Sequence, residues 1–214
     1  YYGAVGETGI TVTGGELSAA ATDSTGTGLY SIQAIVLKDA VVKAEATAQG
    51  SYCAISAGTG VSMTNADVTL SSQSSNAIYT WGGSVSMQGG SLNASAPSSV
   101  VIWSKNNITM EDADVTASSD KDVAVFAKEG QVSASDSLLR LSGPADMDTI
   151  RGNGGTTLTG SWVESRGGTV SAKAQISNSA VLQDGTGEVT GSLTLPQDVS
   201  IPALGTLTVP QGAE

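Results

Sequence analysis

Residues 83–94 read Gly-Ser-Val-Ser-Met-Gln-Gly-Gly-Ser-Leu-Asn-Ala, which is two short runs of alternating side chains joined by a Gly-Gly pair. In the first run, Val85 and Met87 alternate with serine. In the second, Leu92 and Ala94 are separated by asparagine. Alternation with period two predicts strands that bury one face, because successive side chains of a strand point to opposite sides. The glycines predict a tight corner between the two strands, since glycine adopts a left-handed backbone without steric cost.

The first run recurs along the chain at a nearly constant interval. The counterparts of Val85-Ser-Met87 are Ile10-Thr-Val12, Ile35-Val-Leu37, Val61-Ser-Met63, Ile108-Thr-Met110, Val132-Ser-Ala134 and Thr156-Thr-Leu158. Taken in order with Val85 included, their first residues advance by 25, 26, 24, 23, 24 and 24 positions. A fixed period of this length indicates a solenoid, in which each repeat stacks on its neighbours.

Each repeat turns at the same place and then continues as a second strand. The corner residues, four positions after each first residue, are Gly14, Asp39, Asn65, Gly89, Asp112, Asp136 and Gly160. Glycine, asparagine and aspartate tolerate a left-handed backbone best, so we predict that conformation at every corner. The second strand then places Val68, Leu92, Val115 and Leu139 at equivalent positions, and we expect them to stack in one buried column. Residues 1–168 are therefore predicted to form an all-β, right-handed parallel β-helix with coils of about 24 residues.

A third strand precedes each first residue. If the positions eight and six before each first residue face inward, the inward pairs are Cys53/Ile55, Ala77/Tyr79, Val100/Ile102 and Ala124/Phe126. The positions that then face outward are Ile78/Thr80, Val101/Trp103 and Val125/Ala127. The outer face of the first strand is almost uniformly serine and threonine, whereas either choice of inward positions leaves an apolar column outside the third strand. We therefore expect this column to have a partner.

The pattern loosens after Gly168. Ile176, Asn178 and Val181 indicate one shorter coil. Three proline-ended segments follow, at 193–196, 199–202 and 207–210. Proline donates no ladder hydrogen bond, so these segments belong at the edge of a sheet. Residues 169–214 are predicted to be the last short coil and a C-terminal cap.

Composition excludes several classes of function. The 214 residues include 20 Asp and Glu against nine Lys and Arg, a formal net charge of −11, which argues against nucleic acid and against an anionic membrane surface. No apolar run approaches the roughly 20 residues of a membrane span, so we expect no membrane insertion in this segment. The chain has no histidine, which excludes Ser-His-Asp, Cys-His and His-metal chemistry. Cys53, the single cysteine, aligns with small inward residues and is expected to be buried.

The candidate binding site is aromatic. Tyr79, Trp81 and Trp103 gather in neighbouring coils of a chain with 4% aromatic residues, with Lys105 and Asn106 beside them. Sugar rings stack on exposed aromatic rings, and a flat solenoid face presents such rings at regular intervals. The same face could instead be covered by another surface protein, a second protomer or the C-terminal segment. A glycan and a protein partner both remain open.

Acidic residues suggest two further sites, each with a simpler explanation. Asp112, Asp114 and Asp120 cluster with Glu111 and Asp122, and such oxygen ligands are those that Ca²⁺ takes; an acidic, solvated loop surface explains them better. Asp112 and Asp136 occupy the same corner of adjacent coils, at a spacing that suits the paired carboxylates of a retaining glycosidase. The corner geometry alone also accounts for these two residues, and we predict no catalytic residue.

The motif of residues 83–94 resembles the β-helix repeats of cell-surface proteins from Gram-positive and clostridial bacteria. Residues 193–213 look like the Leu-Thr-Ile-Pro rungs of the same proteins. The resemblance implies an extracellular location at a bacterial surface; some such relatives bind carbohydrate, including pectin with calcium. We therefore expect a non-enzymatic domain for adhesion or carbohydrate binding. A polysaccharide lyase or glycoside hydrolase on this scaffold, or a purely structural stalk, are the alternatives.

Overall fold

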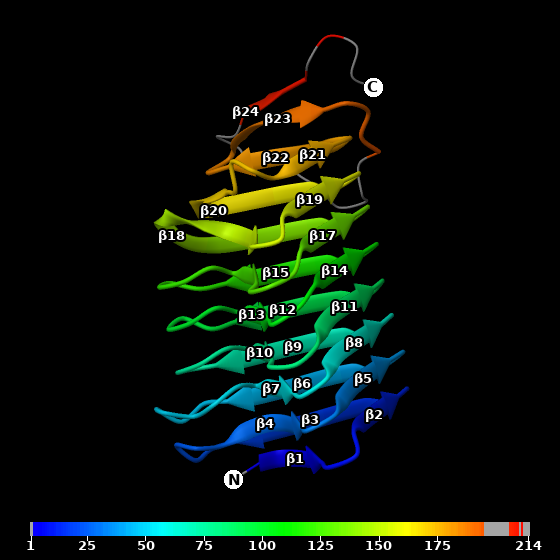
Figure 1. Ribbon diagram of the computed structural model, residues 1–214, viewed down its shortest axis with the longest axis vertical. Helices are drawn as coiled ribbons and strands as arrows, with labels where there is room; N and C mark the ends of the chain where they lie inside the picture. Colours follow the sequence, from blue (N-terminus) through cyan, green and yellow to red (C-terminus); the bar gives the residue numbers. More distant parts are fainter. Residues whose placement is uncertain (1, 195–205, 210, 212–214) are drawn as a thin grey trace.

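The computed structural model describes residues 2–194, 206–209 and 211. These residues form 24 strands and no helix, so the described part of the chain holds no helix that could cross a membrane. The strands stack in coils of about 24 residues along one long axis (Figure 1). The predicted all-β parallel solenoid is confirmed.

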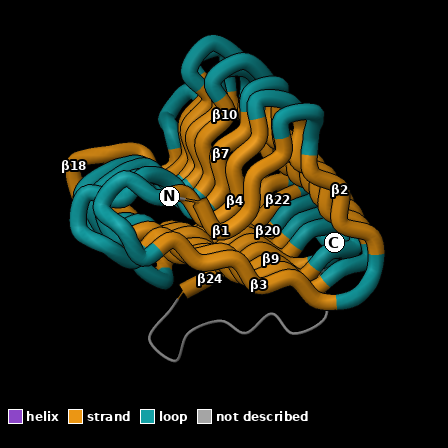
Figure 2. The backbone as a smooth tube through the Cα atoms, turned by 90° about the horizontal axis from the view of Figure 1, so that it is seen from below, coloured by secondary structure: helices purple, strands orange, loops and turns teal. Residues whose placement is uncertain are grey.

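Seen along its axis, the solenoid has three strand-bearing sides (Figure 2). The first sheet is made of β2 (Ile10–Thr13), β5 (Ala34–Lys38), β8 (Gly60–Thr64), β11 (Ser84–Gln88), β14 (Ile108–Glu111), β17 (Val132–Ser135), β19 (Thr156–Thr159) and β21 (Gln175–Ser177). These eight strands mark eight coils.

The second side contains β3 (Glu16–Ala21), β6 (Val41–Ala46), β9 (Asp67–Ser72), β12 (Ser91–Ser95), β15 (Asp114–Ser118), β18 (Leu138–Gly152), β20 (Trp162–Val170) and β22 (Ser179–Gln183). The third side contains β1 (Tyr2–Gly6), β4 (Thr27–Ser31), β7 (Ile55–Ala57), β10 (Ile78–Thr80), β13 (Ile102–Ser104) and β16 (Val125–Ala127). Strand β18 belongs to both sides: its first residues pair with β15 and its last with β16, so the two sides form one continuous sheet.

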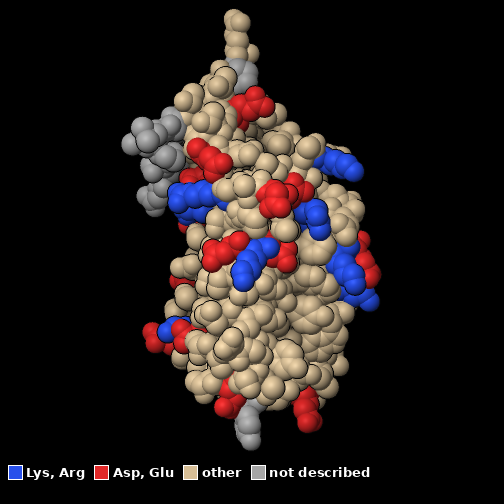
Figure 3. Space-filling model, turned by 90° about the vertical axis from the view of Figure 1, so that its left-hand side faces the viewer, with Lys and Arg blue, Asp and Glu red and all other residues tan. Residues whose placement is uncertain are grey.

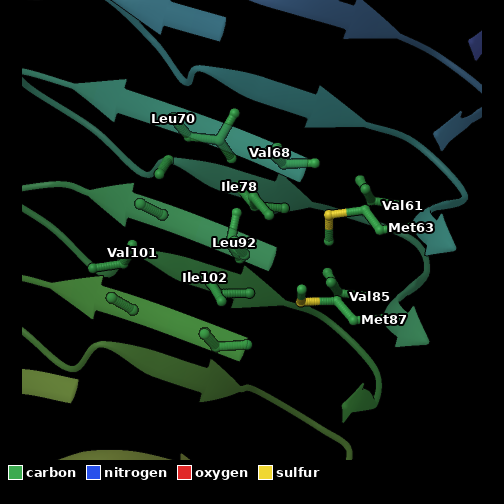
Figure 4. Packing of buried hydrophobic residues seen from close by; sticks show 14 of the residues in the cluster. Val61, Met63, Val68, Leu70, Ile78, Val85, Met87, Leu92, Val101 and Ile102 are labelled. Carbon is green, nitrogen blue, oxygen red and sulfur yellow. The ribbon is translucent and has the colours of Figure 1, made fainter. Parts of the chain in front are cut away.

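The core consists of columns of identical or similar side chains. Val68, Leu92, Val115 and Leu139 are in register across β9, β12, β15 and β18, and each is at most 1% exposed, as predicted. Figure 4 shows the side chains of one coil stacked on those of the next, with Met63 beside Met87. Full burial of such a side chain contributes about 1.5–3 kcal/mol, so the repeat stabilises the fold coil by coil.

The corners also follow the prediction. The seven corner residues from Gly14 to Gly160 all have a positive φ, between 48° and 66°. Asn178 continues the series into the eighth coil with a φ of 48°. One pair of neighbouring corners is also joined through its side chains, since the Asn65 amide donates a hydrogen bond to Asp39 Oδ1 at 3.3 Å.

The third strands differ from the prediction. The positions predicted to face outward, Ile78, Thr80, Val101, Val125 and Ala127, are fully buried, and Trp103 alone of that set faces outward, half-buried. Tyr79 and Phe126, predicted to face inward, pair in register with Trp103 and point outward with it.

A difference in loop length explains this error in the fourth and sixth coils. Six positions separate Ile55 from Val61, but seven separate Ile78 from Val85. The sixth coil, with Val125 and Val132, has the same extra residue. Because side-chain direction alternates along a strand, one added residue exchanges the inward and outward positions when they are counted from the first sheet.

The C-terminal residues close one end of the second side. The predicted eighth coil is present as β21 and β22, after which β23 (Thr186–Thr190) pairs with β22 in antiparallel and β24 (Thr206–Thr208) pairs with β23 in parallel. A small second core under this end contains Trp162, with Leu193 and Leu207 packed against it. The predicted segment at 199–202 lies outside the described residues, as do two residues of the segment at 193–196.

Candidate functional site

A column of outward-facing side chains runs the length of the third side. Strand pairing puts these residues in register from the first coil to the seventh: Val5, Tyr30, Ser56, Tyr79, Trp103, Phe126 and Arg151. The outer positions of the other two sides are mostly Ser, Thr, Asn and charged residues, whereas this column is mostly aromatic or apolar. Its register is fixed by backbone pairing, so the rings are held in line by the scaffold.

The rings of this side form a continuous aromatic ladder, defined here as Tyr2, Tyr30, Trp81, Tyr79 and Trp103. Successive ring centroids in that order lie 4.8, 5.9, 6.2 and 4.7 Å apart. Tyr2 is 51% exposed, and the other four rings are half-buried. These distances fall within the range of favourable ring pairs, so the ladder is one extended apolar platform at the surface.

Two small residues in the third coil leave the space that the ring of Trp81 occupies. Ser56 occupies the place of a ring between Tyr30 and Tyr79, which leaves a gap in the column. Trp81 extends across this gap: its indole lies against Gly58, where an added Cβ would come 3.1 Å from the ring, and reaches Tyr30. A larger residue at either small position would displace a ring of the ladder.

The gap over Ser56 is an open hollow of about 670 Å³. Its walls are the rings of Tyr30, Tyr52, Tyr79 and Trp81, together with Tyr2 at one end. Hydroxyl and amide groups lie at its base and rim, contributed by Thr27, Ser56, Ser75 and Asn76. Aromatic walls with a few polar groups are typical of small-ligand sites, and this hollow has the size of one.

Basic side chains lie at the C-terminal end of the ladder. Lys128 Nζ lies 5.9 Å from the ring centroid of Trp103, and the Arg151 guanidinium lies 4.7 Å from that of Phe126. Both are cation–π contacts. Lys105 lies two residues after Trp103 and one coil beyond Trp81, since its N–H donates to the Thr80 carbonyl. The third side is thus aromatic toward the N-terminus and cationic toward the C-terminus.

Of the predicted binding residues, the structure brings most together. Tyr79, Trp81 and Trp103 are in the ladder, and Lys105 lies beside it. Asn106 lies at the edge of this face, where its side-chain amide donates to the Gly82 carbonyl at 3.2 Å. The sequence reasoning missed Tyr2, Tyr30, Tyr52, Phe126, Lys128 and Arg151. An alignment of Leu-Tyr-Ser at 29–31 with Ile-Tyr-Thr at 78–80 and Ile-Trp-Ser at 102–104 would have found one of them, Tyr30.

The acidic candidates do not converge. Asp112 is an exposed corner residue, whereas Asp114 Oδ1 accepts a hydrogen bond from Arg140 at 2.9 Å in an ion pair. Asp114 begins β15 and Asp120 lies beyond its other end. At the rise per residue of a strand, this puts Asp120 roughly 15–20 Å from Asp114. Among the described residues, no three acidic, cysteine or histidine side chains are grouped so that they could hold a metal ion. Asp112 and Asp136 share the corner column, and the φ of 51° and 48° explains why each is aspartate.

Cys53 is buried, as predicted, behind the hollow. Burial raises the pKa of its thiol to about 11, while a contact with the Ser75 hydroxyl at 3.8 Å acts weakly in the other direction. A thiol with this pKa is protonated at neutral pH, so Cys53 is a packing residue and not a nucleophile.

Comparison with known protein families, with curated protein sequences and with solved structures gives no match.

Proposed function

We propose that this parallel β-solenoid is a non-enzymatic domain that binds carbohydrate along the aromatic ladder. The observation that carries the proposal is the ladder itself, five rings in succession with neighbouring centroids 4.7–6.2 Å apart on an accessible face. Seven of the eight aromatic residues that the structure describes lie on this side, five in the ladder and two beside it as Tyr52 and Phe126.

The chemistry of sugars suits this surface. One face of a pyranose ring carries C–H groups and stacks on an aromatic ring, while its hydroxyls need hydrogen-bond partners at the edge. Here the rings are bordered by Lys105, Ser56 and Asn76. Rungs of a parallel sheet repeat at about 4.8 Å, which is close to the length of one sugar unit in an extended chain. A polysaccharide running parallel to the solenoid axis would meet a ring or polar group at most rungs.

The location we propose is extracellular, at a bacterial surface, where such a domain would serve adhesion or glycan attachment. The likeness of residues 83–94 to surface-protein repeats supports this location, and so does a net charge of −11. A plain stalk would need only the coils, and the hydroxyl-rich outer face of the first sheet shows what a bare solvated side looks like. The ladder departs from that composition, which favours a binding role over a spacer.

The experiment is a glycan array with the full chain, followed by affinity measurement on each retained glycan. We expect Trp103→Ala and Tyr79→Ala to lose binding at least tenfold, about 1.4 kcal/mol or more, and Trp103→Phe to retain most of it. Val41, an apolar side chain 50% exposed on the second side, provides the matched control as Val41→Ala. Glycans retained equally by Trp103→Ala would overturn the proposal, as would an array on which nothing binds.

A further inference from the structure

We infer that the ligand of the ladder is an acidic polysaccharide, whose carboxylate or sulfate groups lie at Lys105, Lys128 and Arg151. This inference rests on the proposed function and assigns the class of glycan. Its basis is the sign of charge along the third side, which is opposite to that of the molecule as a whole.

The two outward columns of this side contain no carboxylate over six coils. From the second coil to the seventh, the residues are Tyr30, Ser56, Tyr79, Trp103, Phe126 and Arg151 in one column and Ile32, Gly58, Trp81, Lys105, Lys128 and Asn153 in the other. The chain has 20 acidic and nine basic residues, yet three basic residues and no acidic one fall here. Glu7, in the first coil, precedes these columns at the opposite end from the cations.

These three cations are available to a ligand. The ion pairs in the described part of the chain join Lys43 to Glu45, Arg140 to Asp114 and Arg166 to Glu164. Lys128 and Arg151 instead lie over the rings of Trp103 and Phe126. The nearest carboxylates along the chain, Glu129 and Asp148, are not ion-paired with them. A cation held on a ring keeps its outer donors free, so it can bind an anion while the neighbouring ring stacks on sugar.

The arrangement also gives the ligand a direction. Rings toward the N-terminal end and cations toward the C-terminal end form two zones along one axis. On the side of the molecule that Figure 3 presents, charged side chains of both signs gather over the C-terminal half, and the centre of the N-terminal half is free of charge. Neutral sugar units would lie over Tyr30 and Trp81, and acidic units would lie from Trp103 onward.

The test uses the full chain on an array that contains neutral, uronate-bearing and sulfated glycans. We expect the retained glycans to be acidic, and their affinity to fall about tenfold between low and high salt, because charges at an exposed site are screened. Lys128→Gln and Arg151→Gln should each weaken binding roughly five- to tenfold. Lys38→Gln, an exposed lysine on β5, removes the same charge from another face and should have no effect. Methyl esterification of a bound uronate glycan, or desulfation of a bound sulfated one, then identifies which anion is read.

Each outcome decides one of the two proposals. Binding of neutral glycans, lost in Trp103→Ala and unchanged in Lys128→Gln and Arg151→Gln, leaves the proposed function standing and overturns the acidic ligand. An array that retains nothing overturns both. A single-stranded oligothymidylate bound as tightly as the glycans would show that the rings and cations bind an anionic polymer that is not a polysaccharide, and would also overturn the inference.

Discussion

The rings of Tyr79 and Trp103 lie with their centroids 4.7 Å apart and their planes tilted by 37°, although a whole coil of chain separates the two residues. They meet because β10 and β13 pair in parallel with these two residues opposite each other. The ladder is therefore a product of backbone register. Any change that shifts one coil by a residue would turn a ring into the core and break the platform.

Double substitution should reveal the energy of this ring pair. We expect Tyr79→Leu and Trp103→Leu to be non-additive by about 0.5–1.5 kcal/mol, because each single change already removes the same ring contact. Free energies of unfolding in urea for both single variants and the double variant measure this coupling. Tyr79→Phe keeps the ring and serves as the control. Strict additivity would mean that the two rings contribute only through separate burial.

Gly89→Val should destabilise the solenoid by at least about 1–2 kcal/mol, because Gly89 has a φ of +66° and a branched side chain disfavours that region. An added Cβ would also come 2.5 Å from Asn65 Oδ1 in the preceding corner. Asp112→Asn should change stability little, because aspartate and asparagine both tolerate the left-handed backbone of this corner. Thermal unfolding of both variants checks the difference, and an unchanged melting temperature for Gly89→Val would contradict the corner explanation.

The sequence was sufficient to predict the coils, the corners and the second strands. Corner identity is a local property of each residue, since Gly89, Asn65 and Asp112 adopt a positive φ for their own steric reasons. The column through Leu92 follows from period-two alternation and a constant length between the first and second strands. Both signals are read within a few residues and do not depend on the rest of the coil.

The third strand could not be placed in the same way, because its distance from the first strand varies. The additional residue in the fourth and sixth coils lies near Gly83 and Gly130, where the chain turns toward the first sheet. Counting back from Val85 therefore assigned Tyr79 wrongly to an inward position. The structure still brings Trp103, Trp81 and Tyr79 together, since neighbouring coils place these residues side by side.

Because of Cys53, the stability of the fold should decrease as the pH rises through the alkaline range. Burial raises the pKa of this thiol from 9.0 to about 11, so the folded state favours the neutral form. The resulting contribution is complete below pH 9 and is lost as the pH rises through 11. Its size is about 2–3 kcal/mol, from two pH units of difference between the folded and unfolded states.

Comparison with Cys53→Ala isolates this effect from lysine and tyrosine titration. Urea unfolding at pH 8 and pH 11 should show a larger loss of stability in the natural protein than in the variant. Equal losses would place the Cys53 thiol in a more hydrated setting than its 4% exposure indicates.

Trp162 should act as a donor as well as an apolar anchor at the C-terminal end. Its indole N–H donates to Glu164 Oε1 at 3.1 Å; both residues are buried, and Trp162 belongs to the cluster that includes Leu182 and Val189. The second carboxylate oxygen has Arg166 at 3.5 Å, whose side chain is largely exposed. Glu164 therefore depends on the indole for its one buried hydrogen bond to another side chain among the described residues.

We expect Trp162→Phe to cost about 1–3 kcal/mol, because the phenyl ring fills most of the space but leaves a buried carboxylate oxygen without its donor. Combining it with Glu164→Leu should recover part of that loss, since removing both polar partners leaves nothing unsatisfied. Hydrogen exchange locates the effect: the amides of β22 and β23, which pair from Ala180 to Val189, should lose protection in Trp162→Phe while those of β12 keep it. A uniform loss of protection along the solenoid would mean that the C-terminal core and the main core unfold as one unit. Full protection in the single variant would mean that Glu164 finds another donor and that Trp162 acts by burial alone.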